Sequence, residues 1–240
     1  IAAEGPEAWP ALRAPRLPKW LRGPLAEAWG PDAIAAMEQA HFAGAPLDLT
    51  AKGDAAALAA AVGGTVLPTG SVRVSAAGQV SAMPGFAEGE WWVQDAAAAI
   101  PVQVLNPQQG ETVLDLCAAP GGKTMQLASS GAAVTAVDDS AARLGRLHEN
   151  LKRTRLNATV EVSDALQHQG SYDAILLDAP CSATGTIRRH PDLPFAKDGS
   201  EFGDLIDLQS RMLDHMWALL KPGGRMVFCT CSLLPDEGEV

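Results

Sequence analysis

One stretch of the chain decides the fold: TVLDLCAAPGGKT, residues 112–124. Its first half is an apolar run that predicts a buried strand, and it leads through two glycines into a helix-like segment that starts at Lys123. Small residues in such a turn let the backbone approach a ligand closely, and the first N–H groups of a helix can receive a carboxylate. The pattern predicts a ligand site directly after the first strand of an α/β domain.

Two phosphate-binding loops are excluded by the same residues. A P-loop needs a glycine at position 117, where this chain has Cys117, and the G-x-G-x-x-G pattern of a dinucleotide loop is absent. A nucleoside that carries an amino acid suits the tight turn and helix end that remain.

Strands and helices alternate from Gly110 onward. We expect strands at 112–117, 133–137, 159–162, 172–177 and 225–231, and helices at 123–130, 141–155 and 201–220. This alternation predicts a doubly wound, mostly parallel α/β sheet with helices on both faces. Ligands bind such sheets beyond the carboxyl ends of the strands, so the residues that follow each strand are the candidates for a site.

The part of the chain before this domain has a mixed pattern. Residues 1–18 are rich in proline, alanine and glycine and predict an arm or linker. Residues 19–82 combine helix-like and strand-like segments and predict a small α/β module. Residues 83–240 form the predicted catalytic domain, which begins with a connector at 83–97. Because the chain starts at Ile1 and stops soon after a strand-like segment, we expect both ends to be incomplete.

Composition and charge limit the classes of protein that fit. The net charge of −10 argues against a non-specific nucleic-acid binder, although it does not exclude a local basic patch. No apolar run is long enough to suggest a membrane span. The four cysteines show no metal-ligand spacing, so we expect no metal, and their small number suits free thiols in the cytoplasm.

Three aspartates follow successive strands and are candidates for binding a nucleoside. Asp138 is placed to accept the two ribose hydroxyls, and Asp164 lies near the place of an adenine, while Asp178 follows the fourth strand. A single aspartate at such a place is more often a helix cap, but three in register after a glycine turn favour a site. We expect Asp139 to cap the helix that starts at Ala141.

Two further strand ends carry a cysteine. Cys181 lies in DAPCS (178–182) and Cys231 in CTCS (229–232), and neighbouring strands would bring both thiols to one cleft. Buried, inert thiols are the simpler interpretation of Cys117 and Cys229. A thiolate that adds to carbon 6 of cytosine makes carbon 5 nucleophilic, and a carboxyl group such as Asp178 can assist at ring nitrogen 3. The residues alone do not decide which thiol attacks.

Four motifs together resemble the Sun (Fmu) family, the bacterial 16S ribosomal RNA cytosine-5 methyltransferases. They are LDLCAAPGGKT (114–124), DAPCSATG (178–185), RRHPD (188–192) and TCS (230–232). The resemblance implies a Rossmann-like S-adenosylmethionine-dependent methyltransferase fold, with Cys231 as nucleophile and Cys181 aiding product release. It also implies contacts to S-adenosyl-L-methionine from Cys117, Ala118, Ala119, Pro120, Gly121, Gly122, Lys123, Asp138, Asp164 and Asp178.

The expected partner is RNA, and ribosomal RNA follows from the resemblance. Arg188 and Arg189 directly follow the Pro-Cys motif and are expected to hold phosphates, and the 19–82 module is expected to bind RNA. Two alternatives stay open: a methyltransferase for another substrate class, which leaves the paired cysteines without a role, and a non-catalytic RNA-binding or assembly factor. The oligomeric state stays open, with a monomer as the default.

Overall fold

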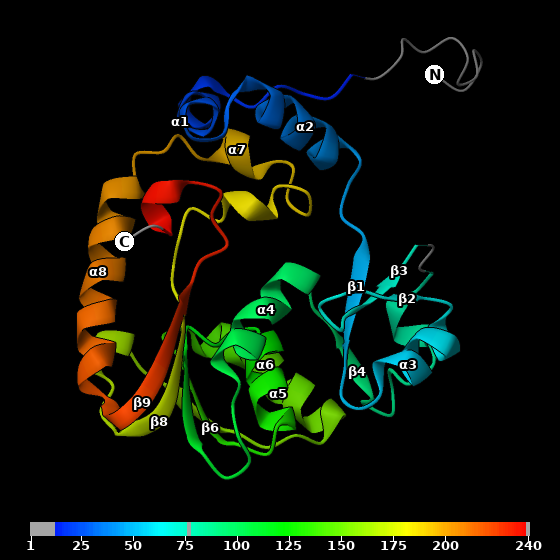
Figure 1. Ribbon diagram of the computed structural model, residues 1–240, viewed down its shortest axis with the longest axis vertical. Helices are drawn as coiled ribbons and strands as arrows, with labels where there is room; N and C mark the ends of the chain where they lie inside the picture. Colours follow the sequence, from blue (N-terminus) through cyan, green and yellow to red (C-terminus); the bar gives the residue numbers. More distant parts are fainter. Residues whose placement is uncertain (1–12, 76–77, 239–240) are drawn as a thin grey trace. The chain divides into compact units, whose positions relative to one another are not determined.

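The computed structural model describes residues 13–75 and 78–238, which fall into two compact units. Unit 1 combines the described parts of 1–45, 182–202 and 232–240, and unit 2 combines those of 46–181 and 203–231. The helices are α1 (Lys19–Trp29), α2 (Pro31–Phe42), α3 (Ala55–Val62), α4 (Ala96–Leu105), α5 (Gly122–Ser129), α6 (Ala141–Thr154), α7 (Leu193–Ala196) and α8 (Phe202–Ala218) (Figure 1). The strands are β1 (Leu47–Ala51), β2 (Thr65–Val66), β3 (Val72–Val74), β4 (Trp91–Val93), β5 (Thr112–Leu116), β6 (Ala133–Asp138), β7 (Thr159–Val162), β8 (Tyr172–Asp178) and β9 (Leu220–Cys229). Short 3₁₀ turns are η2 (Val80–Ala82), η3 (Ala165–Gln167), η4 (Thr184–Thr186) and η5 (Pro235–Glu237).

The larger sheet of unit 2 has five parallel strands in the order β7-β6-β5-β8-β9. The chain starts in the middle at β5, builds outward through β6 and β7, and then returns to the other side of β5 with β8 and β9. This confirms the predicted doubly wound sheet. Strands β5 and β8 are neighbours at the point where the strand order reverses. The residues that follow them therefore lie beside one another at the carboxyl edge.

Helices cover both faces of this sheet because side chains of successive strand residues point to opposite faces (Figure 1). On one face, Met212 and Met216 of α8 pack against Leu114 and Leu177. The other face is covered by α4, α5 and α6, whose buried residues include Val102, Leu105, Leu127, Leu144, Leu147 and Leu151. The central strands β5, β6 and β8 are therefore buried on both sides, as their sequence predicts.

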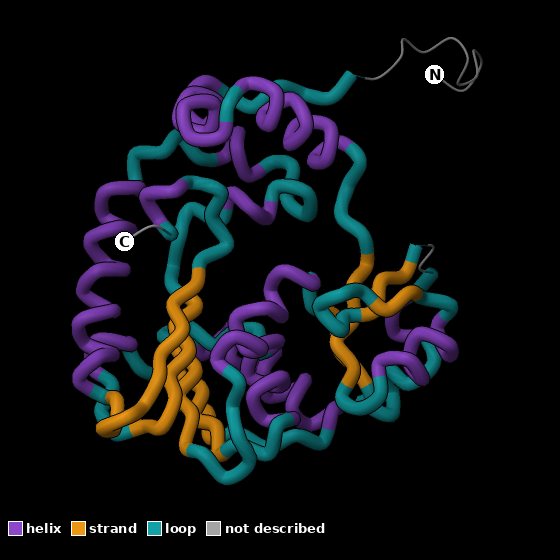
Figure 2. Tube along the Cα trace, in the orientation of Figure 1, coloured by secondary structure: helices purple, strands orange, loops and turns teal. Residues whose placement is uncertain are grey.

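The smaller sheet of unit 2 is antiparallel, with the order β2-β3-β1-β4, and its strands form a separate group from the larger sheet (Figure 2). β4 pairs with β1 through Leu49 and Val93, so the sheet crosses the predicted boundary between residues 82 and 83. That boundary and the 83–97 connector were wrong, because a three-residue strand is too short to show in the pattern. Trp91 and Trp92 are fully buried core residues.

The small sheet is attached to α6 by polar contacts as well as by packing. Arg153 donates from Nη1 to the carbonyl oxygens of Phe86 and Trp91, both at 2.9 Å, and its guanidinium lies 4.3 Å from the Phe86 ring centroid. Lys52 donates from Nζ to the carbonyl oxygen of Thr154 at 2.6 Å. The small sheet is thus part of the same compact unit as the larger one.

Unit 1 packs α1, α2, α7, η4 and η5 around one apolar cluster. Leu21, Leu25 and Ile34 are fully buried in it, with Ile187 and Leu234 from the later segments. The predicted 19–82 module is therefore divided, because its two helices belong to unit 1 and its strands to unit 2. The predicted arm lies outside the described residues up to position 12, and Leu17 at its far end is buried.

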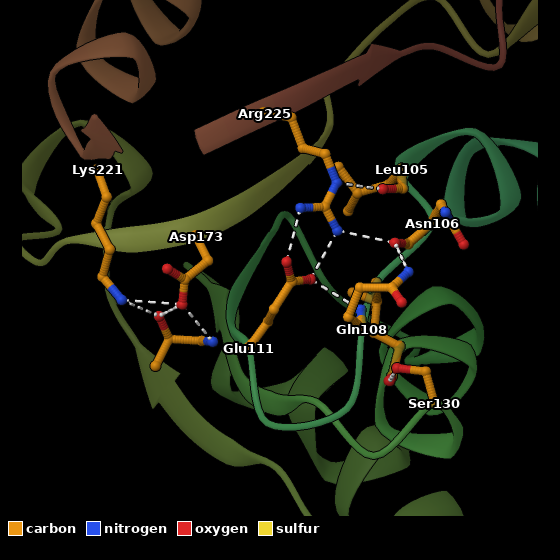
Figure 3. A network of polar contacts seen from close by, with 10 residues as sticks. Leu105, Asn106, Gln108, Glu111, Ser130, Asp173, Lys221 and Arg225 are labelled. Carbon is orange, nitrogen blue, oxygen red and sulfur yellow. Dashed lines mark hydrogen bonds and ion pairs between the residues drawn. The ribbon is translucent and has the colours of Figure 1, made fainter. Parts of the chain in front are cut away.

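The amino edge of the five-stranded sheet is closed by a polar network (Figure 3). Arg225 contacts both carboxylate oxygens of Glu111, at 2.8 and 2.6 Å, and donates to the carbonyl oxygens of Leu105 and Asn106 where α4 ends. A second group at this edge joins Lys221, Asp173 and Thr112, with distances of 2.7–2.9 Å.

Among the helices of residues 13–75 and 78–238, none has the length and apolar character needed to span a membrane.

Candidate functional site

The glycine turn joins β5 to α5 at the carboxyl edge of the five-stranded sheet. Gly121 has φ +104°, and a Cβ built there would lie 3.0 Å from Cγ of Leu147, so only glycine fits. No side chain caps the start of α5, which leaves its first N–H groups facing out of the helix end. The turn therefore combines a close backbone approach with free N–H donors, as the sequence predicts.

Asp138 at the end of β6 organises this turn. Its buried carboxylate accepts hydrogen bonds from the Ala119 N–H at 3.1 Å, the Ser140 N–H at 3.0 Å and Arg143 Nη2 at 2.8 Å. Ser140 caps α6, so the expectation that Asp139 is the cap was wrong. Asp139 instead forms an ion pair with Arg143.

A cavity of about 340 Å³ opens beside Asp138 within unit 2. Its walls combine the polar residues Asp138 and Asp164 with apolar ones, including Val137, Pro180 and Met212. Asp164 is exposed and accepts from the Leu166 N–H at 2.9 Å, so it is a turn cap that also lines the cavity. The volume falls in the range of about 300–1,000 Å³ that is typical of small-molecule pockets.

Asp178 ends β8 and is held on both carboxylate oxygens. Lys123 Nζ donates to Oδ2 at 2.7 Å, and the Cys229 thiol donates to Oδ1 at 3.5 Å. Burial opposes the charge of Lys123, but the attraction and the hydrogen bond of Asp178 outweigh it and raise the pKa of the lysine. The glycine turn and the DAPCS motif are thus joined by one ion pair.

Cys181 and Cys231 come together, as their strand positions predict. Their sulfur atoms are 3.4 Å apart within unit 2, and neither cysteine forms a disulfide bond. The hydrogen bond from Cys181 lowers the pKa of Cys231 to about 7, against an opposing effect of burial. Cys231 is therefore substantially thiolate near neutral pH, which is the reactive form of a cysteine.

The other two cysteines, Cys117 and Cys229, have raised pKa values, which favour the unreactive thiol form. Burial raises the pKa of Cys117 to about 12, with the charge of Asp138 acting in the same direction. Burial and the neighbouring Asp178 carboxylate raise the pKa of Cys229 further. Of Cys117, Cys229 and Cys231, only Cys231 has a pKa below its usual value.

A cluster of hydroxyl groups within unit 1 follows Cys181 and Cys231 in the chain. Ser182 Oγ and Ser232 Oγ are 3.1 Å apart, and Thr184 Oγ1 lies 3.3 Å from each of them. Thr184 Oγ1 also accepts from the Leu233 N–H at 2.8 Å, and the buried Glu237 carboxylate accepts from the Ser182 N–H at 2.7 Å. We call Ser182, Thr184 and Ser232 the hydroxyl clamp.

The two arginines expected to bind RNA have different environments. Arg188 donates to the carbonyl oxygens of Ala40, at 3.1 Å, and Gly44, at 3.2 and 2.8 Å, so two of its three nitrogens serve the packing of unit 1. Arg189 is exposed. Of the pair, Arg189 has its guanidinium in solvent.

Sequence reasoning missed Asp115, which lies in the middle of β5 and is completely buried. Burial raises its pKa to about 7, while a hydrogen bond from the Thr124 hydroxyl at 2.5 Å opposes the shift. Its Oδ1 atom has no hydrogen-bond partner among the described residues. A charged residue within the apolar run VLDL is the signal that could have marked it.

A family model described as 16S rRNA methyltransferase RsmB/F matches residues 102–240, which is more than half of the chain. The chain belongs to this family. The match includes the glycine turn, Asp178 and both close thiols, and it confirms the resemblance that the four motifs indicated.

Relatives and solved structures agree with this RsmB/F assignment. Ribosomal RNA small subunit methyltransferase B of Cronobacter sakazakii is 51% identical over 176 residues, covering 70% of this chain and 41% of that protein. The protein of the same name from Salmonella arizonae is 49% identical over the same coverage. A methyltransferase homolog protein from Pyrococcus horikoshii has 30% identity and a TM-score of 0.74, covering 90% of this chain and 74% of that chain. The chain thus spans about two fifths of the length of the curated relatives.

Proposed function

We propose that this chain methylates carbon 5 of a cytosine in ribosomal RNA, with S-adenosylmethionine as methyl donor and Cys231 as nucleophile. The observation that carries the proposal is the pair of sulfur atoms 3.4 Å apart, with the pKa of one thiol lowered to about 7. A methyltransferase for a substrate that is already nucleophilic needs no such pair. The family assignment and the free thiols support action on ribosomal RNA in the cytoplasm.

The cofactor is proposed to bind from the glycine turn to the cavity beside Asp138. Residues Cys117 to Lys123 supply the turn and the helix end for the amino-acid part, Asp138 supplies a carboxylate for the ribose, and Asp164 borders the place of the adenine. The cavity volume, its apolar walls and the uncapped helix fit such a nucleoside. Bound S-adenosylmethionine supplies the methyl group, which carbon 5 of the base takes.

The protein's own groups carry the rest of the reaction. The Cys231 thiolate forms a bond to carbon 6 of the cytosine, and the displaced ring electron pair moves to nitrogen 3, which takes a proton from water. Asp178 accepts a hydrogen bond from that N–H and so holds the proton in place. Lys123 and Cys229 keep the Asp178 carboxylate in one orientation. After methylation the proton on carbon 5 passes to water, its bonding pair restores the double bond between carbons 5 and 6, and the bond from carbon 6 to Cys231 breaks with its pair returning to sulfur. The proton at ring nitrogen 3 is released in the same step. The Cys181 thiol keeps its own proton and assists release by donating a hydrogen bond to the departing Cys231 thiolate.

RNA has to be held while its target base is turned out of the stack. We propose Arg189 as a phosphate contact and Arg188 as a residue that orients the same loop. The basic residues Arg13, Arg16, Lys19 and Arg22 at the start of unit 1 are proposed as a second place for the RNA backbone.

The test is a methylation assay with labelled cofactor and ribosomal RNA, followed by nucleoside analysis. Label is expected in 5-methylcytidine. Cys231→Ala is expected to abolish it while leaving cofactor binding, measured by calorimetry, nearly unchanged. Label in another nucleoside, or full activity of Cys231→Ala, contradicts the proposal.

The roles of the two thiols are separated by a second variant. Cys181→Ala keeps the nucleophile and loses the group that assists release, so a covalent protein–RNA adduct is expected to survive denaturing electrophoresis. Cys229→Ala is the matched control, because it removes a nearby thiol that has no proposed covalent role. An adduct that requires Cys181 and forms without Cys231 would reverse the two assignments.

A further inference from the structure

Unit 1 contains a cavity of about 250 Å³ that the proposed reaction does not use. It is formed where the end of α2, the chain around Arg16 and the segment 187–195 meet. None of its lining residues is a thiol or a carboxylate of the candidate site. Whatever this cavity holds is therefore not the base that reacts.

Two aromatic rings line this cavity and remain open to solvent. Phe42 is 46% exposed and Phe195 is 63% exposed. Leaving a phenylalanine side chain in water forgoes the favourable free energy of its burial, and the same unit buries Leu21 and Leu25 completely. Exposed aromatic rings at a hollow are a common stacking surface for unpaired bases.

The charges around the cavity favour an anionic occupant. Arg16 is exposed at the cavity, and Arg188 lies in its wall, fixed by the carbonyl oxygen of Gly44. Glu38 is the one carboxylate among the lining residues, and it already accepts from the Leu17 N–H and from Arg22 Nε, each at 3.0 Å. The positive charge of the lining is thus not cancelled by a carboxylate within the cavity.

The size of the cavity limits what it can hold. The cavity is slightly smaller than the roughly 300–1,000 Å³ of usual small-molecule pockets, which suits one planar ring better than a whole cofactor.

We propose that this cavity receives one unstacked base of the substrate RNA, distinct from the target cytosine, with Phe42 and Phe195 as stacking surfaces and Arg16 as a phosphate contact. The proposal rests on the proposed function in one respect, the assumption that the substrate is RNA. It adds a place where single-stranded RNA is held while another of its bases reacts.

The test measures binding of a fluorescein-labelled single-stranded oligoribonucleotide to the whole chain by anisotropy. Phe195→Ala and Phe42→Ala are each expected to weaken binding about tenfold, and Phe195→Trp is expected to retain it, because the larger ring still stacks. Trp217→Ala is the matched control, since Trp217 is 71% exposed on α8 and does not line the cavity. Arg16→Ala is expected to lower the salt dependence of binding, which the phenylalanine variants leave unchanged.

Failure of this inference is distinguishable from failure of the proposed function. Loss of RNA binding in the phenylalanine variants, together with no methylated product from the wild-type chain, supports the cavity and refutes the activity. Methylation by the wild-type chain, with both phenylalanine variants binding RNA as tightly as Trp217→Ala does, overturns the cavity. Equal competition by fully paired RNA also overturns it.

Discussion

The two edges of the five-stranded sheet both carry charged side chains, but these side chains differ in what lies next to them. At the amino edge, Arg225 and Lys221 are each paired with a carboxylate and with further polar groups. At the carboxyl edge, Asp178 is also paired, but next to it lies a thiol whose pKa is lowered to about 7. At the amino edge the ion pairs tie elements together, whereas the ion pair at the carboxyl edge lies beside a thiol whose pKa is lowered by a hydrogen bond from a second thiol.

Strand β8 shows the difference within a single element, because it carries an aspartate near each end. Hydrogen bonds from Lys221 and Thr112 hold the pKa of Asp173 well below its usual range. A depressed pKa means that Asp173 stabilises the fold above its unfolded pKa of about 3.9, and that this stabilisation is lost as the pH falls through the lower, folded value. Asp178 has a lysine partner too, yet it lies at the edge where the ligand is expected.

The largest effect is expected from exchanging these two aspartates in turn for asparagine. Asp178→Asn removes the carboxylate proposed to hold the proton at ring nitrogen 3 and is expected to lower methylation about 10²–10⁴-fold. Asp173→Asn is expected to leave the rate unchanged and to lower the melting temperature at pH 7 by a few degrees. Initial rates and thermal melts of both variants measure the contrast.

The pH dependence of the same pair separates the two roles further. The melting-temperature gap between the wild type and Asp173→Asn is expected to be full at pH 7 and to shrink as the pH falls from about 4 towards the lower, folded pKa of Asp173, because Asp173 takes up its proton in the unfolded chain first. A rate loss in Asp173→Asn as large as in Asp178→Asn would remove the distinction between the two edges.

The next effect concerns the thiol. Because the pKa of Cys231 is lowered to about 7, its thiolate fraction rises about tenfold between pH 6 and pH 8, and single-turnover methylation is expected to rise with it. In Cys181→Ala the hydrogen bond that lowers this pKa is lost, so the rise in adduct formation is expected to move to higher pH. The pH profiles of the two proteins are compared by rapid quench. Identical midpoints would mean that Cys181 does not set the protonation of Cys231.

The smallest effect is expected at the amino edge. Arg225→Ala removes a two-point contact to Glu111 and two hydrogen bonds to the end of α4, and it is expected to cost about 1–2 kcal/mol after allowing for solvent screening of the partly exposed pair. That loss corresponds to a fall of roughly 3–6 °C in melting temperature, with methylation unchanged at 25 °C. Lys197→Ala, in an exposed pair with Glu201, is a control for which almost no change is expected. A fall in the methylation rate at 25 °C, where the Arg225→Ala variant is still folded, would show that the two edges of the sheet are coupled.

Much of the larger sheet is predictable because its strands are apolar and are bounded by glycine, proline and aspartate. The strand at 159–162 matches β7 in both bounds. β9 begins five residues earlier than predicted, at Leu220, because Pro222-Gly223-Gly224 is typical of a turn although the chain stays paired to β8 through a register shift. Local patterns do not show such irregular pairing.

The division into units was not predictable for a related reason. β4 is three residues long and pairs with β1, some forty positions earlier, and unit 1 gathers three segments that are far apart in the sequence. In the candidate site, strand order sufficed to bring Cys181 and Cys231 together. The Lys123–Asp178 ion pair and the cap by Ser140 depend on side-chain directions, which spacing alone does not give.

The hydroxyl clamp has a mechanical consequence. Ser182 and Ser232 directly follow Cys181 and Cys231 in the chain, so the hydroxyl clamp links the two chain segments that leave these thiols. We expect substitutions in the clamp to loosen the spacing of the two sulfur atoms without altering either thiol. Hydroxyl groups with no proposed part in bond making would then tune how often the two thiols lie close together.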